Sequence, residues 1–219
     1  MLMIFSLNLK DDSLGVVDGE IPLHDPLLNQ DDKKMEQGTV SEYNEAFDYW
    51  CNILGRPKVL DQNTFDEYKN LFIDNGMWID DIKELGRYLR SGYESDVYVS
   101  YADPSMVLKV KLQQYTKTLV GTLISAKYHN LLFPETCYSL IGFTAKKNNI
   151  YVVLGQNRVR GTTVGVKRVC AYFEQRGYTV YELGAAVSKD GLLAFGITGT
   201  DAVEHDGNIY VMDCYVYML

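Results

Sequence analysis

Apolar and polar residues alternate in the middle of the chain with the period of two that is typical of strands. The alternation begins at Leu85, stops at a glycine-containing break over residues 91–95, and resumes with β-branched and aromatic residues at 97–99. After a second break comes an apolar run over residues 106–110, in which Lys109 is the single cation. The pattern predicts a hairpin followed by a third strand. Because a lysine in a buried strand requires an anionic partner, Lys109 is a candidate functional residue.

Three other segments repeat their apolar residues at helical spacing. The first covers residues 41–54 with Thr39 or Ser41 as its cap, the second covers residues 63–75, and the third covers residues 115–130. We interpret the aromatic residues of the first two helices as packing onto the strands that follow. A partner-binding groove is the alternative use of the same aromatic residues.

Two further strands are predicted at residues 138–144 and 150–154, joined by a polar turn. With the hairpin and the third strand they make five antiparallel strands, accompanied by one helix. Gly155 and Gln156 follow the last strand directly. We interpret these two residues as a hinge to the rest of the chain.

Composition and charge narrow the classes of function. The chain has 219 residues, 47% of them hydrophobic, which is enough for a full core. Its formal net charge of −8 argues against a nucleic-acid-binding surface, which needs clustered Lys and Arg. The four cysteines and three histidines lack the spacing of a zinc site, and no apolar run approaches the length of a membrane span. We therefore expect a cytoplasmic protein that binds neither nucleic acid nor membranes.

The hairpin sequence G-Y-E-S-D-V-Y, followed by V-L-K-V, resembles the start of a protein-kinase-like fold. In that fold a glycine-containing hairpin covers the phosphates of the nucleotide and a lysine on the third strand binds two of them. The resemblance implies that Gly92 is the loop glycine, that Val97 covers the adenine and that Lys109 binds phosphate. The loop departs from the usual G-x-G-x-x-G pattern, since it has one glycine. For this stretch alone, a plain β-meander with Lys109 reaching solvent is the alternative.

Later segments make the resemblance more specific. H-N-L-L-F-P-E, V-V-L-G-Q, the helical stretch V-G-V-K-R-V-C-A-Y-F and the ending D-G-N-I-Y-V-M-D follow one another in the order typical of the polyvalent-protein kinase family of phages and mobile elements. The chain resembles that family from about Leu85 onward. The resemblance implies an α+β, protein-kinase-like fold with a five-stranded antiparallel N-lobe, a truncated C-lobe and a helical N-terminal extension. We assign residues 1–80 to an arm and helical extension, 81–155 to the N-lobe, and 156–219 to an abbreviated C-lobe.

Phosphoryl transfer needs a cation on the phosphates, a metal held by oxygen ligands, and a group that accepts the proton of the incoming hydroxyl. Asp213 ends a predicted strand, and the resemblance implies that it is the metal-binding aspartate of the D-F-G motif. Asp201 stands where the kinase loop has a metal-binding asparagine, and a carboxylate is a suitable ligand for magnesium. The resemblance therefore implies ATP and Mg²⁺ as cofactors, with Asp201 and Asp213 as metal ligands.

Two groups that kinases use are missing from their expected positions. The loop spacing D-x-x-x-x-N puts the catalytic aspartate five residues before Asp201, where the sequence has Gly196. The helix glutamate that pairs with the phosphate lysine is also missing, because no acid lies between Lys109 and Glu135. Glu135 and Glu94 are the two acids available as substitutes.

These observations predict a catalytically degenerate kinase-like protein of phage or mobile-element origin that binds a nucleotide and acts mainly through a protein partner. The alternative is an active, divergent ATP-dependent protein kinase with a protein substrate, in which Lys109, Asp201 and Asp213 suffice. A third interpretation is an accessory subunit in which the fold has no ligand.

Overall fold

The computed structural model describes residues 38–56, 62–92, 94–112, 116–182, 184–197 and 201–219. They form a mixed α and β structure, as the sequence predicts. Residues 1–37 of the arm predicted at the start of the chain lie outside the described residues. Within the described part, no helix combines the length and the apolar character that a bilayer span requires.

A six-stranded sheet organises the first half of the described chain, with the order β1-β5-β6-β4-β3-β2. Its strands are β1 (Trp78–Ile79), β2 (Gly86–Ser91), β3 (Ser95–Ser100), β4 (Met106–Lys111), β5 (Tyr138–Lys146) and β6 (Asn149–Asn157). Strands β2 to β6 occupy the five predicted segments and pair antiparallel, whereas the short β1 joins β5 in parallel. The pairing of β6 with β4 continues to Asn157. The sheet therefore extends past Gly155 and Gln156, where the hinge is predicted.

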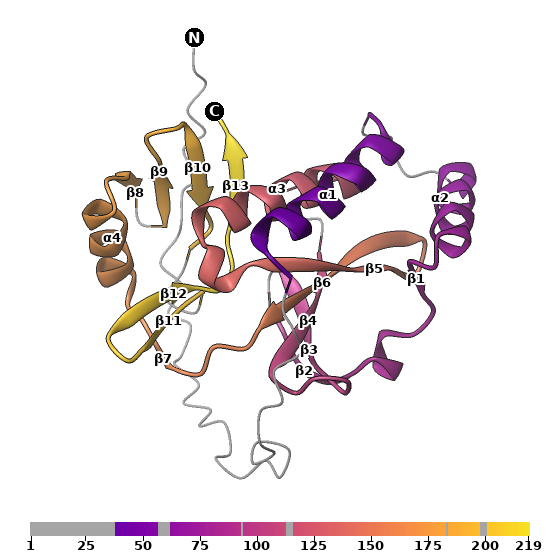
Figure 1. Cartoon of the computed structure of the whole chain (residues 1–219), viewed down its shortest axis with the longest axis horizontal. Coiled ribbons are helices and arrows are strands. Elements are labelled where there is room, and N and C mark those ends of the chain that lie inside the picture. Colours follow the sequence, from indigo (N-terminus) through magenta and orange to yellow (C-terminus); the bar gives the residue numbers. More distant parts are fainter. Residues whose placement is uncertain (1–37, 57–61, 93, 113–115, 183, 198–200) are drawn as a thin grey trace, which may run out of the picture. The chain divides into compact units, whose positions relative to one another are not determined.

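Three helices share a hydrophobic core with this sheet: α1 (Val40–Leu54), α2 (Gln62–Asp74) and α3 (Leu119–Leu132) (Figure 1). Phe72 of α2 stacks on Phe143 of β5 with ring centroids 3.7 Å apart. The aromatic residues of the first two helices thus pack onto the strands, as interpreted from the sequence.

The beginnings of two helices are fixed by threonine caps. Thr39 caps α1 in a capping box, since its side chain accepts from the amide of Glu42 while the Glu42 side chain accepts from the amide of Thr39. Thr118 caps α3 by accepting from the amide of Gly121. The sequence placed the start of this third helix at residue 115, which is too early, because the Thr118 cap sets the first turn at Leu119.

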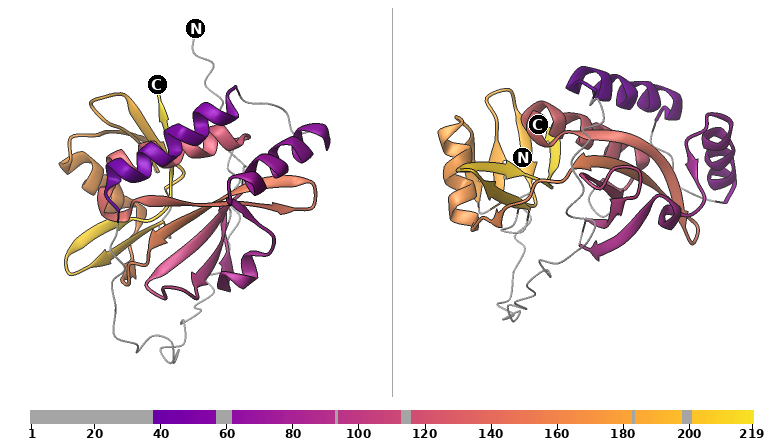
Figure 2. Two further views of the ribbon diagram at one scale, coloured as in Figure 1. Left: turned by 45° about the vertical axis from the view of Figure 1, so that its right-hand side comes forward. Right: turned by 60° about the horizontal axis from the view of Figure 1, so that its bottom comes forward.

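The second half of the described chain contains helix α4 (Val166–Gln175) and two small sheets with the orders β13-β10-β9-β8 and β12-β11-β7. The strands are β7 (Thr162–Thr163), β8 (Thr179–Glu182), β9 (Ala185–Val187), β10 (Leu192–Phe195), β11 (Ala202–His205), β12 (Asn208–Val211) and β13 (Tyr215–Met218). Their apolar core includes Val169, Phe173 and Ala194, and it takes in Leu132 and Phe133 at the end of α3. The views in Figure 2 show α4 on the outside of this half and α3 next to β13. Helix α3 therefore belongs to both cores.

Candidate functional site

Strand β4 presents two buried lysines on one face of the sheet. Lys109 and Lys111 are two residues apart, so their side chains point to the same side, and each residue is 5% exposed. Across the strand pair, Lys109 lies opposite Val97 and Lys111 lies opposite Ser95. Because directly opposed residues share a face, these four side chains form one patch.

The carboxylate of Asp213 lies between the two lysines. Lys109 Nζ is 3.3 Å from Oδ2 and Lys111 Nζ is 2.7 Å from Oδ1. Ser95 Oγ donates to Oδ2 at 3.2 Å, and the hydroxyl of Tyr138 donates to Oδ1 at 3.1 Å. Both oxygens of Asp213 are therefore bound by buried donors, two of them cations.

Electrostatics fix the charge states in this cluster. Burial opposes the ionisation of Asp213, but the charges of Lys109 and Lys111 overcome it and hold the pKa of Asp213 well below its ordinary value. Burial also opposes the charge of Lys111, yet Asp213 and Glu94 raise the pKa of this lysine. For Lys109, burial outweighs the attraction of Asp213 and lowers its pKa. An added anion such as phosphate would favour the charged form of Lys109.

Glu94 adds a second carboxyl group from the β2–β3 hairpin. Its side chain is 11% exposed, and Oε2 lies 3.5 Å from Lys111 Nζ. Burial and then the negative charge of Asp213 raise the pKa of Glu94 to about 8, against the opposing effect of Lys111. A carboxyl group with a pKa near the working pH suits acid–base chemistry.

Gly196 lies next to this carboxyl group. It follows Phe195, the last residue of β10, which pairs with Tyr215 of β13. Its φ of 79° is in the left-handed region that favours glycine. A Cβ atom placed on Gly196 would lie 3.1 Å from Oε1 of Glu94. The position at which the catalytic aspartate is expected therefore faces Glu94.

Asp201 reaches the cluster through the β11–β12 hairpin, which returns the chain to Asp213. The carbonyl oxygen of Asp201 accepts from the amides of Met212 at 2.7 Å and Asp213 at 3.3 Å. Within the described ranges, no three His, Cys, Asp or Glu side chains are grouped as metal ligands. Mg²⁺ typically uses one or two carboxylates and takes its other ligands from phosphates and water. Two neighbouring aspartates are therefore compatible with a magnesium site completed by a nucleotide.

Buried polar groups of the H-N-L-L-F-P-E-T stretch hold the segment that carries Asp213. Thr136 Oγ1 donates to the carbonyl oxygen of Val211 at 2.6 Å. His129 Nδ1 lies 3.5 Å from Cys214 Sγ, and His129 Nε2 lies 3.2 Å from the carbonyl oxygen of Thr136. This motif thus fixes the residues on both sides of Asp213 and orients its carboxylate toward β4.

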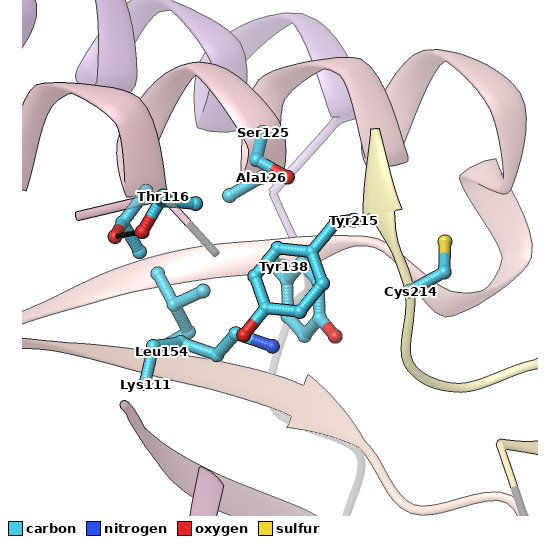
Figure 3. A pocket seen from close by; sticks show the side chains of 9 residues that line it. Lys111, Thr116, Ser125, Ala126, Tyr138, Leu154, Cys214 and Tyr215 are labelled. Carbon is cyan, nitrogen blue, oxygen red and sulfur yellow. Dashed lines mark hydrogen bonds between the residues drawn. The ribbon is translucent and has the colours of Figure 1, made fainter. Parts of the chain in front are cut away.

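Figure 3 shows a small cavity beside Lys111. Its lining includes Ser125 from α3 and the rings of Tyr138 and Tyr215. Lys111 Nζ lies 5.8 Å from the ring centroid of Tyr138 and 5.1 Å from that of Tyr215. The cavity has a volume of about 10 Å³, which is room for about one water molecule. Protein side chains therefore enclose Lys111 on this side.

The structure brings four of the residues singled out in the sequence into one cluster, namely Lys109, Gly196, Asp201 and Asp213. Val97 lies opposite Lys109 on the same face of the sheet. Gly92 lies in the turn of the hairpin, where its amide donates to the carbonyl oxygen of Ser95 at 2.8 Å. Glu135 and Glu94 are the two acids considered as substitutes for the helix glutamate. The carboxyl of Glu135 lies 3.6 Å from the guanidinium of Arg176 in the second half of the chain. Glu94 is the one that lies in the cluster, next to Lys111.

Sequence reasoning missed Lys111 and Tyr138. The signal for Lys111 was present, because any residue two positions after a buried lysine in a strand faces the same side. Tyr138 was assigned to its strand alone. Its hydroxyl donates to Asp213, which is distant in sequence, and the local sequence around Tyr138 does not indicate this contact.

One family of known proteins matches most of the chain. Residues 64–219 match the model of a family described as "Serine/Threonine/Tyrosine Kinase found in polyvalent proteins". The match confirms the resemblance seen in the sequence, and it begins within α2, upstream of Leu85. No curated protein matches the chain.

Proposed function

Because this chain belongs to the family of serine/threonine/tyrosine kinases found in polyvalent proteins, we propose that it binds ATP with Mg²⁺ and transfers phosphate to a hydroxyl group of a protein. The observation that supports this most directly is the convergence of Lys109 and Lys111 on Asp213, at 3.3 and 2.7 Å. Buried cations gathered on one carboxylate form a ready site for phosphate oxygens.

In this proposal the two lysines bind the phosphates, with Lys109 as the residue of the kinase pattern and Lys111 as an additional one. Once phosphate oxygens satisfy both lysines, the carboxylate of Asp213 is free to serve as an oxygen ligand, together with Asp201. Mg²⁺ held there would neutralise charge on the phosphates. Val97 would lie against the adenine, as its place opposite Lys109 suggests.

The second candidate is a degenerate kinase-like protein from a phage or mobile element that binds the nucleotide without transferring phosphate and acts through a protein partner. Gly196 favours this candidate, because it stands where the loop should provide the base and has no side chain that could accept a proton. Both candidates share the nucleotide site and differ in the transfer step.

Thermal shift measurements test the shared nucleotide site. A ligand that binds the folded state alone stabilises it by about 2.7 kcal/mol at a hundred times its Kd. We expect millimolar ATP with Mg²⁺ to raise the Tm of the wild type and of Lys167→Ala, an exposed lysine on α4, but not of Lys109→Ala. A wild type without any shift would contradict nucleotide binding and leave the ligand-free accessory subunit.

Transfer of radiolabel from ATP separates the two candidates. The active form predicts label on the protein itself or on an added protein substrate, and it predicts that Asp213→Ala abolishes this label. Binding without label would favour the degenerate form.

A further inference from the structure

Gly196 and Glu94 are complementary in space. Gly196 has no side chain at the place where a kinase loop has its aspartate, and the carboxyl of Glu94 enters from the opposite side. The separation of 3.1 Å between Oε1 and a Cβ position on Gly196 is a tight contact, so a side chain at residue 196 would push the end of the Glu94 side chain aside. The acid that is missing from the loop is therefore present in the hairpin.

The surroundings hold Glu94 in this place. Its carbonyl oxygen accepts from the amide of Leu112 at 2.7 Å, which anchors the hairpin turn beside the end of β4. Its Oε2 lies 3.5 Å from Lys111 Nζ, and its side chain is 11% exposed. Backbone and side-chain contacts therefore hold this carboxyl group next to Lys111, one of the two lysines proposed to bind phosphate.

We propose that Glu94 accepts the proton of the substrate hydroxyl in phosphoryl transfer, in place of the aspartate that Gly196 replaces. This inference rests on the proposed function. The hydroxyl oxygen forms a bond to the γ-phosphorus, and the bond between that phosphorus and the β,γ-bridging oxygen breaks, with its electron pair going to ADP. The hydroxyl proton goes to Glu94 in its carboxylate form, which is the minor form at pH 7 because the pKa of this group is raised to about 8. Lys111 Nζ lies 3.5 Å from Oε2 of Glu94 and 2.7 Å from Oδ1 of Asp213, so it holds the Glu94 carboxyl group beside the proposed phosphate site.

A purely structural ion pair between Glu94 and Lys111 is the competing explanation. The two explanations predict different results for Glu94→Gln, which keeps the size of the side chain and its hydrogen bonds but cannot take up a proton. A structural pair predicts a lower Tm with the rate of transfer little changed. A proton acceptor predicts a rate lower by about 10²- to 10⁴-fold, with the ATP-induced rise in Tm retained.

The experiment measures kcat for label transfer and the Kd for ATP with Mg²⁺ in the full chain. Glu84→Gln is the matched control, since this glutamate lies exposed in the short helix Ile82–Glu84, before the same hairpin. We expect Glu84→Gln to match the wild type in both quantities. We expect Glu94→Gln to lose at least a hundredfold in kcat while its Kd stays within about threefold.

A double variant tests whether a carboxyl group at residue 196 can replace the one at residue 94. Glu94→Ala together with Gly196→Asp moves the carboxylate back into the loop, and aspartate is among the residues that tolerate the left-handed region. We expect this double variant to regain at least tenfold in kcat over Glu94→Ala alone. Gly196→Asp alone brings its side chain against Glu94 and is expected to gain nothing.

Three results would overturn the inference. One is a Glu94→Gln variant that keeps kcat within threefold of the wild type, and another is a double variant no faster than Glu94→Ala. The third is a wild type that binds ATP with Mg²⁺ but transfers no label. This result would support the nucleotide site and contradict the role of Glu94 as a proton acceptor. A wild type that does not bind ATP at all would refute the proposed function itself. The Kd measurement distinguishes this outcome from a failure of the inference about Glu94.

Discussion

Asp213 is the residue on which the whole cluster depends. Its negative charge favours the charged forms of both Lys109 and Lys111, and burying a charge is costly without such a partner. The pKa of this carboxyl is held well below its ordinary value by Lys109 and Lys111 against the effect of burial. In the proposed nucleotide complex, phosphate oxygens would take over this charge balance by binding the same two lysines.

His129 gives a residue-scale prediction about pH. Burial, reinforced by the charge of Lys109, lowers the pKa of His129 to about 3 from its ordinary value of 6.5. The folded state therefore keeps this histidine neutral while the unfolded chain binds a proton below pH 6.5. The contribution of His129 to stability is complete above pH 6.5 and is lost as the pH falls toward 3. At about 1.4 kcal/mol per pH unit, the loss between pH 6.5 and 5 is about 2 kcal/mol.

Urea unfolding between pH 7 and 5 measures this contribution. We expect the stability of His129→Gln to depend less on pH than that of the wild type, by about 2 kcal/mol over the range. His205→Gln is the control, because the side chain of His205 is 52% exposed in the β11–β12 hairpin. Equal pH dependence in the wild type and His129→Gln would show that the buried histidine does not titrate as described.

Single residues were predicted from the sequence where a motif fixed their position. Lys109 and Asp213 have a place in the kinase pattern, and the structure brings them to 3.3 Å from each other. Glu94 was noted only as one of two acids near the lysine, because its approach to Gly196 depends on how the hairpin folds over the later half of the chain. Contacts of this kind join residues far apart in sequence, and local sequence patterns do not predict them.

At the scale of elements, hydrophobic periodicity predicted the long helices and strands and failed for short ones. Helix α1 (Val40–Leu54) falls where its aromatic stripe indicates. The two-residue β1 and β7 and the short β8 and β9 were not predicted. Such short strands contain too few residues to show a period, and they are held in place by their neighbours in the sheet.

Helix α2 provides the prediction at this scale. The family match begins within it, and Phe72 is fully buried against Phe143 and Trp50. We expect Phe72→Ala to cost about 3–5 kcal/mol of unfolding free energy, because it removes a stacked ring from a closed core. Ile73→Ala is the control, since Ile73 is 49% exposed on the same helix.

Urea unfolding at pH 7 distinguishes the two variants. A small effect of Phe72→Ala, similar to that of Ile73→Ala, would mean that α2 is an appendage rather than part of the kinase-like core. A large effect would place the start of the folding unit upstream of Leu85, consistent with the range of the family match.

At the scale of the whole described chain, α3 packs into two hydrophobic cores, and each half of the chain provides only part of the site. Its first turns pack with the six-stranded sheet, while Leu132 packs with the second half. Ser125, in the middle of α3, accepts a hydrogen bond from the amide of Val216 at 3.0 Å. The lysines come from one half and Asp213 comes from the other, so the site exists only when both halves are folded against α3.

Hydrogen exchange with and without ATP and Mg²⁺ tests this joint site. A ligand held by Lys109, Lys111 and Asp213 stabilises both halves against local opening, because each opening that separates them also releases the ligand. We expect slower exchange in peptides from β3 and β4 and, to a similar extent, in peptides covering residues 211–216. The outer helix α4 serves as the internal reference and should change little. Protection confined to β3 and β4 would mean that the ligand binds the sheet alone, and the role proposed for Asp213 would then be wrong.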